Sequence, residues 1–433
     1  MIDSKIKLAE CNLGELTEVL IRGNGFGHET LWIKSYFDGK TFGIIEETPN
    51  VYMHNICQNT LIDFFKSKSF ELNLETYYDD SGEVSVTYEN LEIDLDIYKR
   101  IYKNAMLFFK NGNDSVCLCV NNYGPREISY RLYAPVKYNS LLKEWFTYSK
   151  KHSFYKNKKI DANLRFLKIN TTTWDDIVLP SRIIKVIKNN ISELFDMQEY
   201  LSVNEIPLKS GIILAGPPGV GKTILCKILA KELPITVLYA MPDSMGMTND
   251  IKSLCEMAID LAPCMMILED LDYIAEEREY SRNSGGVMEL MNYLDGLQEF
   301  NDIITLAKTN AIDKLEGAVK NRPGRFDRVI KIPCPDEDCR LRMFEIFTKK
   351  YTVKDVGFTQ LVVDTEGLSG AHLKDLCKTA VRNAIRERSV DDKKIAILKN
   401  VHFTKALKEV QNIDYASHYK EQAKARSRAG FQN

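Results

Sequence analysis

Residues 216–223 read Gly216-Pro217-Pro218-Gly219-Val220-Gly221-Lys222-Thr223. An apolar run at residues 211–215 precedes this stretch, and a helical pattern at residues 224–231 follows it. A phosphate-binding loop requires this strand–loop–helix context, because glycines let backbone N–H groups surround an anion at a helix N-terminus. The stretch therefore predicts a nucleoside triphosphate site, in which Lys222 reaches the β- and γ-phosphates and the Thr223 hydroxyl ligates Mg²⁺.

A second buried strand is predicted at residues 264–268, which read Cys-Met-Met-Ile-Leu. A continuous apolar run of this kind is typical of a strand that is covered on both faces. It ends in Glu269-Asp270. Two carboxylates at this position suit a pair in which one holds Mg²⁺ and one orients an attacking water. A helix-capping acidic turn is the alternative interpretation.

A third strand is predicted at residues 303–307, and it leads to Thr309-Asn310. The amide of Asn310 can hold the attacking water or the γ-phosphate. Further along, residues 321–328 carry Arg322 and Arg325. Guanidinium groups at such a place can meet the negative charge of a phosphoryl-transfer transition state.

These motifs, in this order, resemble the AAA clade of ATPases. Residues 174–177, Trp-Asp-Asp-Ile, look like the motif that opens the family's ATPase region, and residues 322–327 match its paired-arginine stretch. Residues 368–373 match its Ser-Gly-Ala-Asp motif, with His372 in place of the acid. The resemblance covers about residues 168–412, and its specificity rests on agreement of several motifs in order and spacing.

The resemblance implies an α/β P-loop NTPase, with a parallel sheet that has helices on both faces, followed by a helical lid. It also implies a hexameric ring with ATP between protomers. Asn310 would be the sensor residue, and Arg322 and Arg325 would act on the γ-phosphate of the neighbouring protomer. Backbone near Ile177, Gly370 and Ala371 would hold the adenine.

Two features depart from the family. Its acidic strand usually ends Asp-Glu, whereas this chain has the reverse order. By position, Glu269 takes the metal and Asp270 orients the water, a swap that is similar to the mitochondrial translocase of the folded Rieske protein. Residues 240–248 offer Met245 and Met247 where threading members carry an aromatic. Methionine is flexible and weakly specifying, so this loop weakens the case for residue-by-residue threading.

Residues 1–160 predict an α+β client or partner domain of no recognised family, mostly antiparallel sheet. Period-two alternation predicts strands at residues 70–75, 84–88, 91–97, 116–120 and 128–132, with a turn at 79–82 and a helix at 141–146. Residues 161–335 would be the large ATPase subdomain and residues 336–412 the small helical lid, with helices at 338–350, 370–388 and 403–411. Residues 413–433 would be a basic tail.

The composition of the chain argues against several classes of function. The formal net charge of −2 argues against a dedicated nucleic-acid binder. No apolar run has the length of a membrane helix and no signal-peptide core is present, so we expect a cytoplasmic protein without a membrane anchor. The ten cysteines show no zinc spacing. Cys117 and Cys119 fall on one face of a predicted strand, which favours a reduced structural pair.

The leading hypothesis is an ATPase that hydrolyses ATP to ADP and phosphate and acts as a protein remodeller or chaperone on a client held by the N-terminal domain. A nucleic-acid motor or loader is the second hypothesis, and it would need a basic channel or a basic N-terminal domain. A nucleotide-gated scaffold with slow turnover is the third, and the reversed Glu269-Asp270 pair keeps it open.

Overall fold

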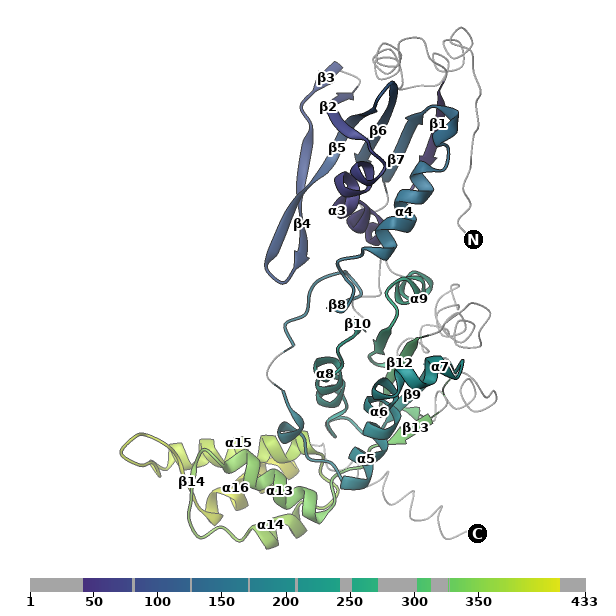
Figure 1. The fold of residues 1–433 in the computed structure, drawn as a ribbon. Helices are drawn as coiled ribbons and strands as arrows, with labels where there is room; N and C mark the ends of the chain where they lie inside the picture. Colours follow the sequence, from purple (N-terminus) through teal and green to yellow (C-terminus); the bar gives the residue numbers. More distant parts are fainter. Residues whose placement is uncertain are drawn as a thin grey trace, which may run out of the picture. The chain divides into compact units, whose positions relative to one another are not determined.

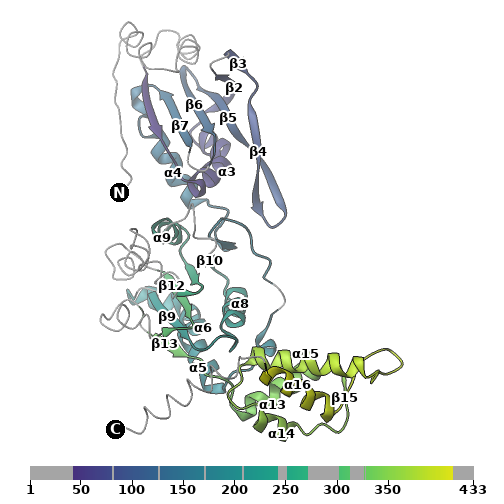
Figure 2. The same ribbon diagram turned by 180° about the vertical axis from the view of Figure 1, so that it is seen from behind.

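The computed structural model describes residues 42–79, 82–124, 127–169, 172–206, 209–241, 251–271, 302–312, 326 and 328–412. The chain divides into two compact units. The N-terminal unit takes residues up to 168 together with residues 256–262, and the C-terminal unit takes the remainder. Figures 1 and 2 show both units from opposite sides. The domain boundaries at 160, 335 and 412 stay predictions.

The N-terminal unit contains an antiparallel sheet in the order β1-β7-β6-β5-β2-β3, and β4 also pairs with β5. The strands of this sheet are β1 Gly43–Glu47, β2 Glu71–Asp79, β3 Gly82–Val84, β4 Thr87–Asp94, β5 Ile97–Asn111, β6 Asp114–Asn122 and β7 Ile128–Ala134. A short strand, β8 Lys159–Asp161, follows later in the chain and is not part of this sheet. The expected α+β region with a mostly antiparallel sheet is confirmed.

Two helices, α3 Val51–Ser67 and α4 Leu141–Lys151, pack against each other on one face of this sheet (Figures 1 and 2). A short 3-10 helix, η1 Val136–Tyr138, precedes α4. The ring of Phe65 in α3 stacks on that of Phe109 in β5, with 4.0 Å between centroids. Trp145 of α4 is completely buried beside Phe65. Aromatic packing therefore fixes both helices to the sheet.

The other face of the sheet carries a smaller apolar cluster. Cys117 and Cys119 of β6 lie in it together with Met106 and Phe108 of β5. Side chains alternate between faces along a strand, so Phe108 points away from the neighbouring Phe109. Both thiols are buried. The expectation that Cys117 and Cys119 share one face is confirmed.

One predicted strand in this unit is wrong. Residues 91–97 form the end of β4, a turn, and the start of β5. Asp96 takes a left-handed backbone with φ of 57°, and its N–H donates to Glu92 Oε1 at 3.1 Å. Acidic side chains thus cap a hairpin turn inside a stretch whose alternation continues without interruption. Strands β2 and β3 pair on either side of the turn predicted at residues 79–82, with Asp79 opposite Gly82, and residues 80 and 81 themselves lie outside the described residues.

The C-terminal unit is built on a parallel sheet in the order β13-β9-β12-β11-β10. Its strands are β9 Lys209–Ala215, β10 Thr236–Ala240, β11 Cys264–Leu268, β12 Ile303–Thr309 and β13 Arg328–Lys331. Every residue of β10, β11 and β12 is buried. Helices flank the sheet, so the predicted parallel α/β fold is confirmed.

The helices of this unit are α5 Ser181–Asn190, α6 Ser192–Asp196, α7 Gln198–Val203 and α8 Lys222–Glu232, with the 3-10 helix η2 Trp174–Asp176 ahead of them. Helix α9 Ile251–Asp260 starts in this unit, and its residues from 256 on belong to the N-terminal unit. Helix α8 packs against β12, and α5 packs against β13. Because all five strands are parallel, their carboxyl ends meet at one edge, which is where open α/β sheets bind ligands.

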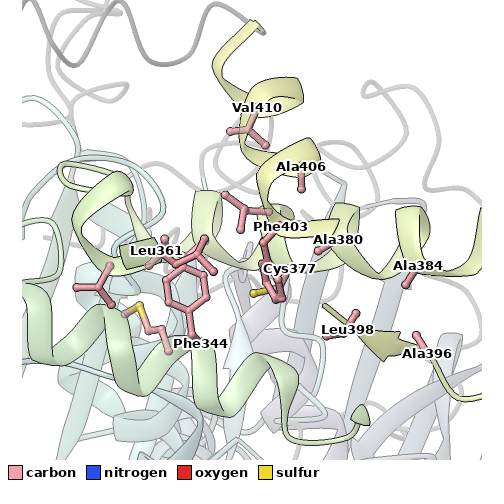
Figure 3. Packing of buried hydrophobic residues seen from close by; sticks show 14 of the residues in the cluster. Phe344, Leu361, Cys377, Ala380, Ala384, Ala396, Leu398, Phe403, Ala406 and Val410 are labelled. Atoms are coloured by element: carbon pink, nitrogen blue, oxygen red, sulfur yellow. The ribbon is translucent and has the colours of Figure 1, made fainter. Parts of the chain in front are cut away.

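A helical lid follows the sheet. It contains α13 Glu337–Thr348, α14 Phe358–Asp364, α15 Gly370–Arg386 and α16 Asn400–Asn412, with the short strands β14 Thr352–Val353 and β15 Ile397–Leu398. Figure 3 shows its core, in which Phe344, Leu361 and Phe403 pack together. The helices expected at 338–350, 370–388 and 403–411 correspond to α13, α15 and α16, whereas α14 was not expected. The predicted basic tail lies outside the described residues.

Candidate functional site

The loop at residues 216–221 connects β9 directly to α8, whose first residue is Lys222. Gly219 and Gly221 have φ angles of 79° and 104°, in the left-handed region that favours glycine. A Cβ on Gly216 would lie 2.1 Å from the carbonyl oxygen of Ile332. Steric constraints therefore explain the glycine at each of the positions 216, 219 and 221. Between them, Pro218 is exposed and Val220 is buried.

Lys222 brings two predicted site elements together. Its Nζ donates to the carbonyl oxygens of Gly216 and Pro217 at 2.6 and 2.9 Å. It also donates to Oδ1 of Asn310 at 2.9 Å, just beyond the end of β12. The lysine is only 5% exposed. The loop and the strand-end amide therefore form one site, as their positions in the sequence predict.

The acidic pair follows β11 at the same edge. Glu269 is buried, and the hydroxyl of Tyr239 in β10 donates to its Oε1 at 2.6 Å. Burial raises the pKa of Tyr239, and the nearby Cys226 and Glu269 raise it further, so the phenol stays a donor. Asp270 has a left-handed backbone with φ of 50° and is more exposed than Glu269. The two carboxylates thus differ in environment, because Glu269 is buried and hydrogen-bonded whereas the side chain of Asp270 is partly exposed.

Lys308 links the acidic pair to the loop, and it was not among the predicted site residues. Its Nζ donates to Thr223 Oγ1 at 2.9 Å. The same ammonium lies 3.1 Å from Glu269 Oε1 and 3.6 Å from Asp270 Oδ1. Thr223, Glu269 and Asp270 therefore surround one positive charge. The available signal was a single lysine inside an otherwise uncharged strand, β12.

The residues expected near the adenine all border the loop. Ile177 is buried, and a Cβ on Gly221 would lie 3.2 Å from its Cδ1. The N–H of Ala371 donates to the carbonyl oxygen of Gly219 at 3.0 Å. A Cβ on Gly370 would lie 3.4 Å from that same oxygen. The first residues of lid helix α15 are therefore bonded to the phosphate-binding loop.

His372 has a local structural role at this junction. Helix α15 starts after Ser369, and Nδ1 of His372 accepts from the backbone N–H of Ser369 at 3.2 Å. An acidic residue at this position of a capping box makes the same bond. Burial lowers the pKa of His372, whereas Asp375 opposes that shift. The neutral ring is the form that caps the helix.

Several predicted residues lie outside the described part of the chain: Arg322, Arg325, Met245 and Met247. Across the residues that the structure describes, no group of three or more His, Cys, Asp or Glu side chains is arranged to hold a metal ion. Within the same ranges, no helix has both the length and the apolar character that a membrane span needs.

Comparison with known proteins agrees with this geometry. Residues 212–334 match the model of the ATPase family associated with various cellular activities (AAA). The chain is 33% identical to the proteasome-activating nucleotidase of Methanocaldococcus jannaschii, over 50% of this chain and 58% of that protein. It is 35% identical to the nucleotidase of that name from Archaeoglobus fulgidus, over 46% of this chain and 52% of that protein.

A probable 26S proteasome regulatory subunit 4 of Caenorhabditis elegans is 33% identical, over 50% of this chain and 52% of that protein. The chain thus spans little more than half the length of these relatives. The matched segment includes the loop at residues 216–221, the acidic pair Glu269-Asp270 and Asn310, which follows β12. This chain therefore contains an AAA ATPase domain and is homologous to proteasome-activating nucleotidases.

Proposed function

We propose that this chain hydrolyses ATP to ADP and phosphate and uses the energy to remodel protein clients. The observation that carries the proposal is the meeting of Lys222 with Asn310 inside a glycine-defined loop. Glu269 and Asp270 follow the adjacent strand at the same edge. A phosphate cradle, a cation and carboxylates at one edge are the parts that phosphoryl transfer to water needs.

In this proposal the loop holds the phosphates and Lys222 balances their negative charge. Backbone near Ile177, Gly370 and Ala371 holds the adenine, although the N–H of Ala371 is already donated to the loop. Asp270 accepts the proton of the attacking water, directly or through a second water, and Asn310 orients that water. Arg322 and Arg325 reach the γ-phosphate from the neighbouring protomer.

The oxygens at the loop fit Mg²⁺. Thr223 Oγ1 and Glu269 Oε1 both lie within 3.1 Å of the Lys308 ammonium, so they already converge on one positive charge. Hydroxyl and carboxylate oxygens are the hard donors that Mg²⁺ prefers, and this ion keeps several waters besides. Thr223 and Glu269 would hold the ion, which would neutralise phosphate charge when bound.

We propose a homo-hexameric ring in the cytoplasm, with ATP between protomers and a protein as client. The names of the relatives refer to the proteasome, which supports a protein client over a nucleic acid. The reversed acidic pair supports the finer resemblance to the Rieske translocase, and the methionines at 245 and 247 support clients that are not gripped by a pore aromatic. Light scattering in the presence of nucleotide measures the mass of the assembly and so tests the proposed hexamer.

One observation favours a second candidate, a nucleotide-gated scaffold with slow turnover. Lys308 lies against both carboxylates, 3.1 Å from Glu269 and 3.6 Å from Asp270. An ammonium at that distance competes with the attacking water for the oxygens of the carboxylate that must orient it. Turnover without a client would then be slow.

The test measures ATP turnover by the full chain alone, with a denatured model protein, and with single-stranded DNA. We expect stimulation by the denatured protein. Stimulation by DNA instead would favour a nucleic-acid motor, and slow turnover under all conditions would favour the scaffold. Lys222→Ala should weaken nucleotide binding about 10–100-fold, because it removes a charged hydrogen-bond donor. Lys227→Ala, an exposed lysine of the same helix α8, is the matched control.

A further inference from the structure

Lys308 lies where the loop, the acidic pair and β12 meet, and the proposed reaction assigns it no role. We propose that Lys308 is a built-in counter-cation of the Mg²⁺-binding oxygens, and that Mg²⁺ must displace its ammonium in order to bind. The inference deepens the proposed function and rests on it, because it assumes that Thr223 and Glu269 are the metal-binding residues.

The contacts support a dedicated position for the ammonium. Its three oxygen neighbours come from three places in the chain: Thr223 in α8, and Glu269 and Asp270 after β11. The bond to Thr223 is 2.9 Å long, and the nearest Glu269 oxygen lies at 3.1 Å. A flexible surface lysine would not meet three converging oxygens at these distances. The lysine is part of the built site.

The surroundings of Lys308 explain why it stays there. Strand β12 is buried along its whole length, and Lys308 itself is 9% exposed. Lysine is almost never buried in a protein unless it is paired. Here the partners are two carboxylates, of which Glu269 is itself buried. Removing the lysine would leave adjacent carboxylates without this cation, and the burial of Glu269 would make that costly.

The same geometry makes the Lys308 ammonium and Mg²⁺ compete for the same oxygens. Mg²⁺ demands oxygen ligands at about 2.0–2.1 Å in near-octahedral geometry. An ammonium hydrogen-bonded to Thr223 Oγ1 and paired with Glu269 Oε1 occupies those oxygens and repels a second cation. The side chain of Lys308 must therefore swing away when the metal binds. Its presence weakens the affinity of the site for Mg²⁺ and stabilises the fold when Mg²⁺ is absent.

Thermal unfolding of the full chain in Mg²⁺ alone, without nucleotide and at constant ionic strength, tests this directly. Lys308→Met keeps the length of the side chain and removes its charge. We expect this variant to be less stable than wild type in EDTA and to gain stability on addition of Mg²⁺. Its half-maximal Mg²⁺ concentration should be about 10–100-fold lower than that of wild type, the worth of a charged hydrogen bond.

Two further variants keep the result interpretable. Lys308→Gln is neutral but keeps a hydrogen-bond donor in the side chain, and it replaces the methionine variant if that one fails to fold. Lys331→Met removes an exposed lysine at the end of the edge strand β13 and should behave like wild type. If wild type and the folded neutral variant respond to Mg²⁺ alike, the proposal is overturned.

Binding of a fluorescent ATP analogue to wild type at saturating Mg²⁺ is measured in parallel. A chain that binds the analogue, with equal Mg²⁺ responses in wild type and Lys308→Met, overturns only the role of Lys308. A chain that does not bind it overturns the proposed function. The Mg²⁺ response without nucleotide then still reports on Lys308.

Discussion

The antiparallel sheet of the N-terminal unit and the parallel sheet of the C-terminal unit place their buried polar side chains differently. In the N-terminal unit these side chains lie between helix α3 and the sheet, in the middle of the packed layers. In the parallel sheet of the C-terminal unit, the buried charged side chains Lys222, Glu269 and Lys308 lie at the carboxyl edge of the strands. The position of a buried polar group within its sheet thus separates a structural role from a chemical one.

The network of the N-terminal unit is closed. The hydroxyl of Tyr130 lies 2.8 Å from His54 Nδ1, and Gln58 Nε2 donates to that hydroxyl at 3.2 Å. On its other side, His54 Nε2 lies 3.3 Å from Asn122 and 3.4 Å from Glu89. The contact with His54 lowers the pKa of Glu89. A network that satisfies its members in this way rigidifies a core.

The edge of the parallel sheet is organised for a ligand. Lys222 and Lys308 are both buried lysines, and both donate to oxygens at this edge. Their partners come from segments that follow different strands, including the start of helix α8, so their geometry can change without unfolding the sheet. This contrast implies that substitutions at the edge change turnover, whereas substitutions in the N-terminal network change stability.

The largest expected effect is that of Asp270→Asn. Asparagine tolerates the left-handed backbone at this position, where φ is 50°, so the fold is retained. The amide cannot accept the water's proton, and we expect turnover to fall about 10²–10⁴-fold while nucleotide binding persists. Single-turnover hydrolysis and equilibrium binding measure the two quantities separately.

Asp364→Asn, in an exposed part of lid helix α14, is the matched control and should leave turnover unchanged. If Asp270→Asn instead lost its binding of Mg²⁺-ATP while hydrolysing whatever it bound at the normal rate, the roles of Glu269 and Asp270 would be exchanged. That outcome would leave the contrast between the sheet edge and the N-terminal network intact, but it would contradict the assignment of Asp270 as the base.

A smaller effect is expected in the N-terminal network. Tyr130→Phe keeps the ring, which packs on Trp145, and removes the hydroxyl that contacts His54 and Gln58. Leaving buried partners unsatisfied costs about 1–3 kcal/mol of unfolding free energy. Urea unfolding of the full chain should detect this loss, while the ATP turnover of the folded protein stays at the wild-type value.

Tyr98→Phe is the control for this change, because Tyr98 is 61% exposed. Its effect on the unfolding free energy should stay within about 0.5 kcal/mol. A Tyr130→Phe variant with normal stability and strongly reduced turnover would break the contrast between the two units. The N-terminal network would then take part in the reaction cycle.

The parts of the fold that follow from local chemistry were predictable. The loop at residues 216–223 was recognisable because its glycines and Lys222 are each required by nearby atoms. The hairpin after β4 was missed because the alternating pattern continues across it, and only the side chains of Glu92 and Asp94 mark the turn. Helix α3 was missed because its buried face includes the polar residues His54, Gln58 and Thr60.

Residues of the candidate site were predictable only where the sequence pattern of a single segment marks them. Glu269, Asp270 and Asn310 could be proposed because each follows an apolar run at the edge of a parallel sheet. The function of Lys308 depends on Thr223 and Glu269, which lie far from it in sequence and approach it only when β11 and β12 pair. Sequence pattern identifies the end of a strand, but it does not say which charges meet there.

The smallest expected effect concerns the cap of lid helix α15. In the folded chain burial lowers the pKa of His372, so the unfolded chain, with an ordinary pKa of about 6.5, takes up the proton more readily. Protonation also removes the Nδ1 acceptor of the Ser369 N–H. The stability that the neutral ring contributes is therefore present above about pH 6.5 and is lost as the pH falls below that value.

His372→Asp isolates this contribution, because aspartate keeps an acceptor at the helix N-terminus and stays ionised down to about pH 4. Urea unfolding of both proteins between pH 8 and pH 5 cancels the other five of the six histidines, which the variant shares. We expect the variant to gain on wild type as the pH falls, by up to about 1 kcal/mol, the typical worth of a cap. Asp375, which faces the ring, repels the new carboxylate and keeps the gain small. A difference between the two proteins that does not change with pH would show that the His372 ring does not contribute to stability through its neutral form.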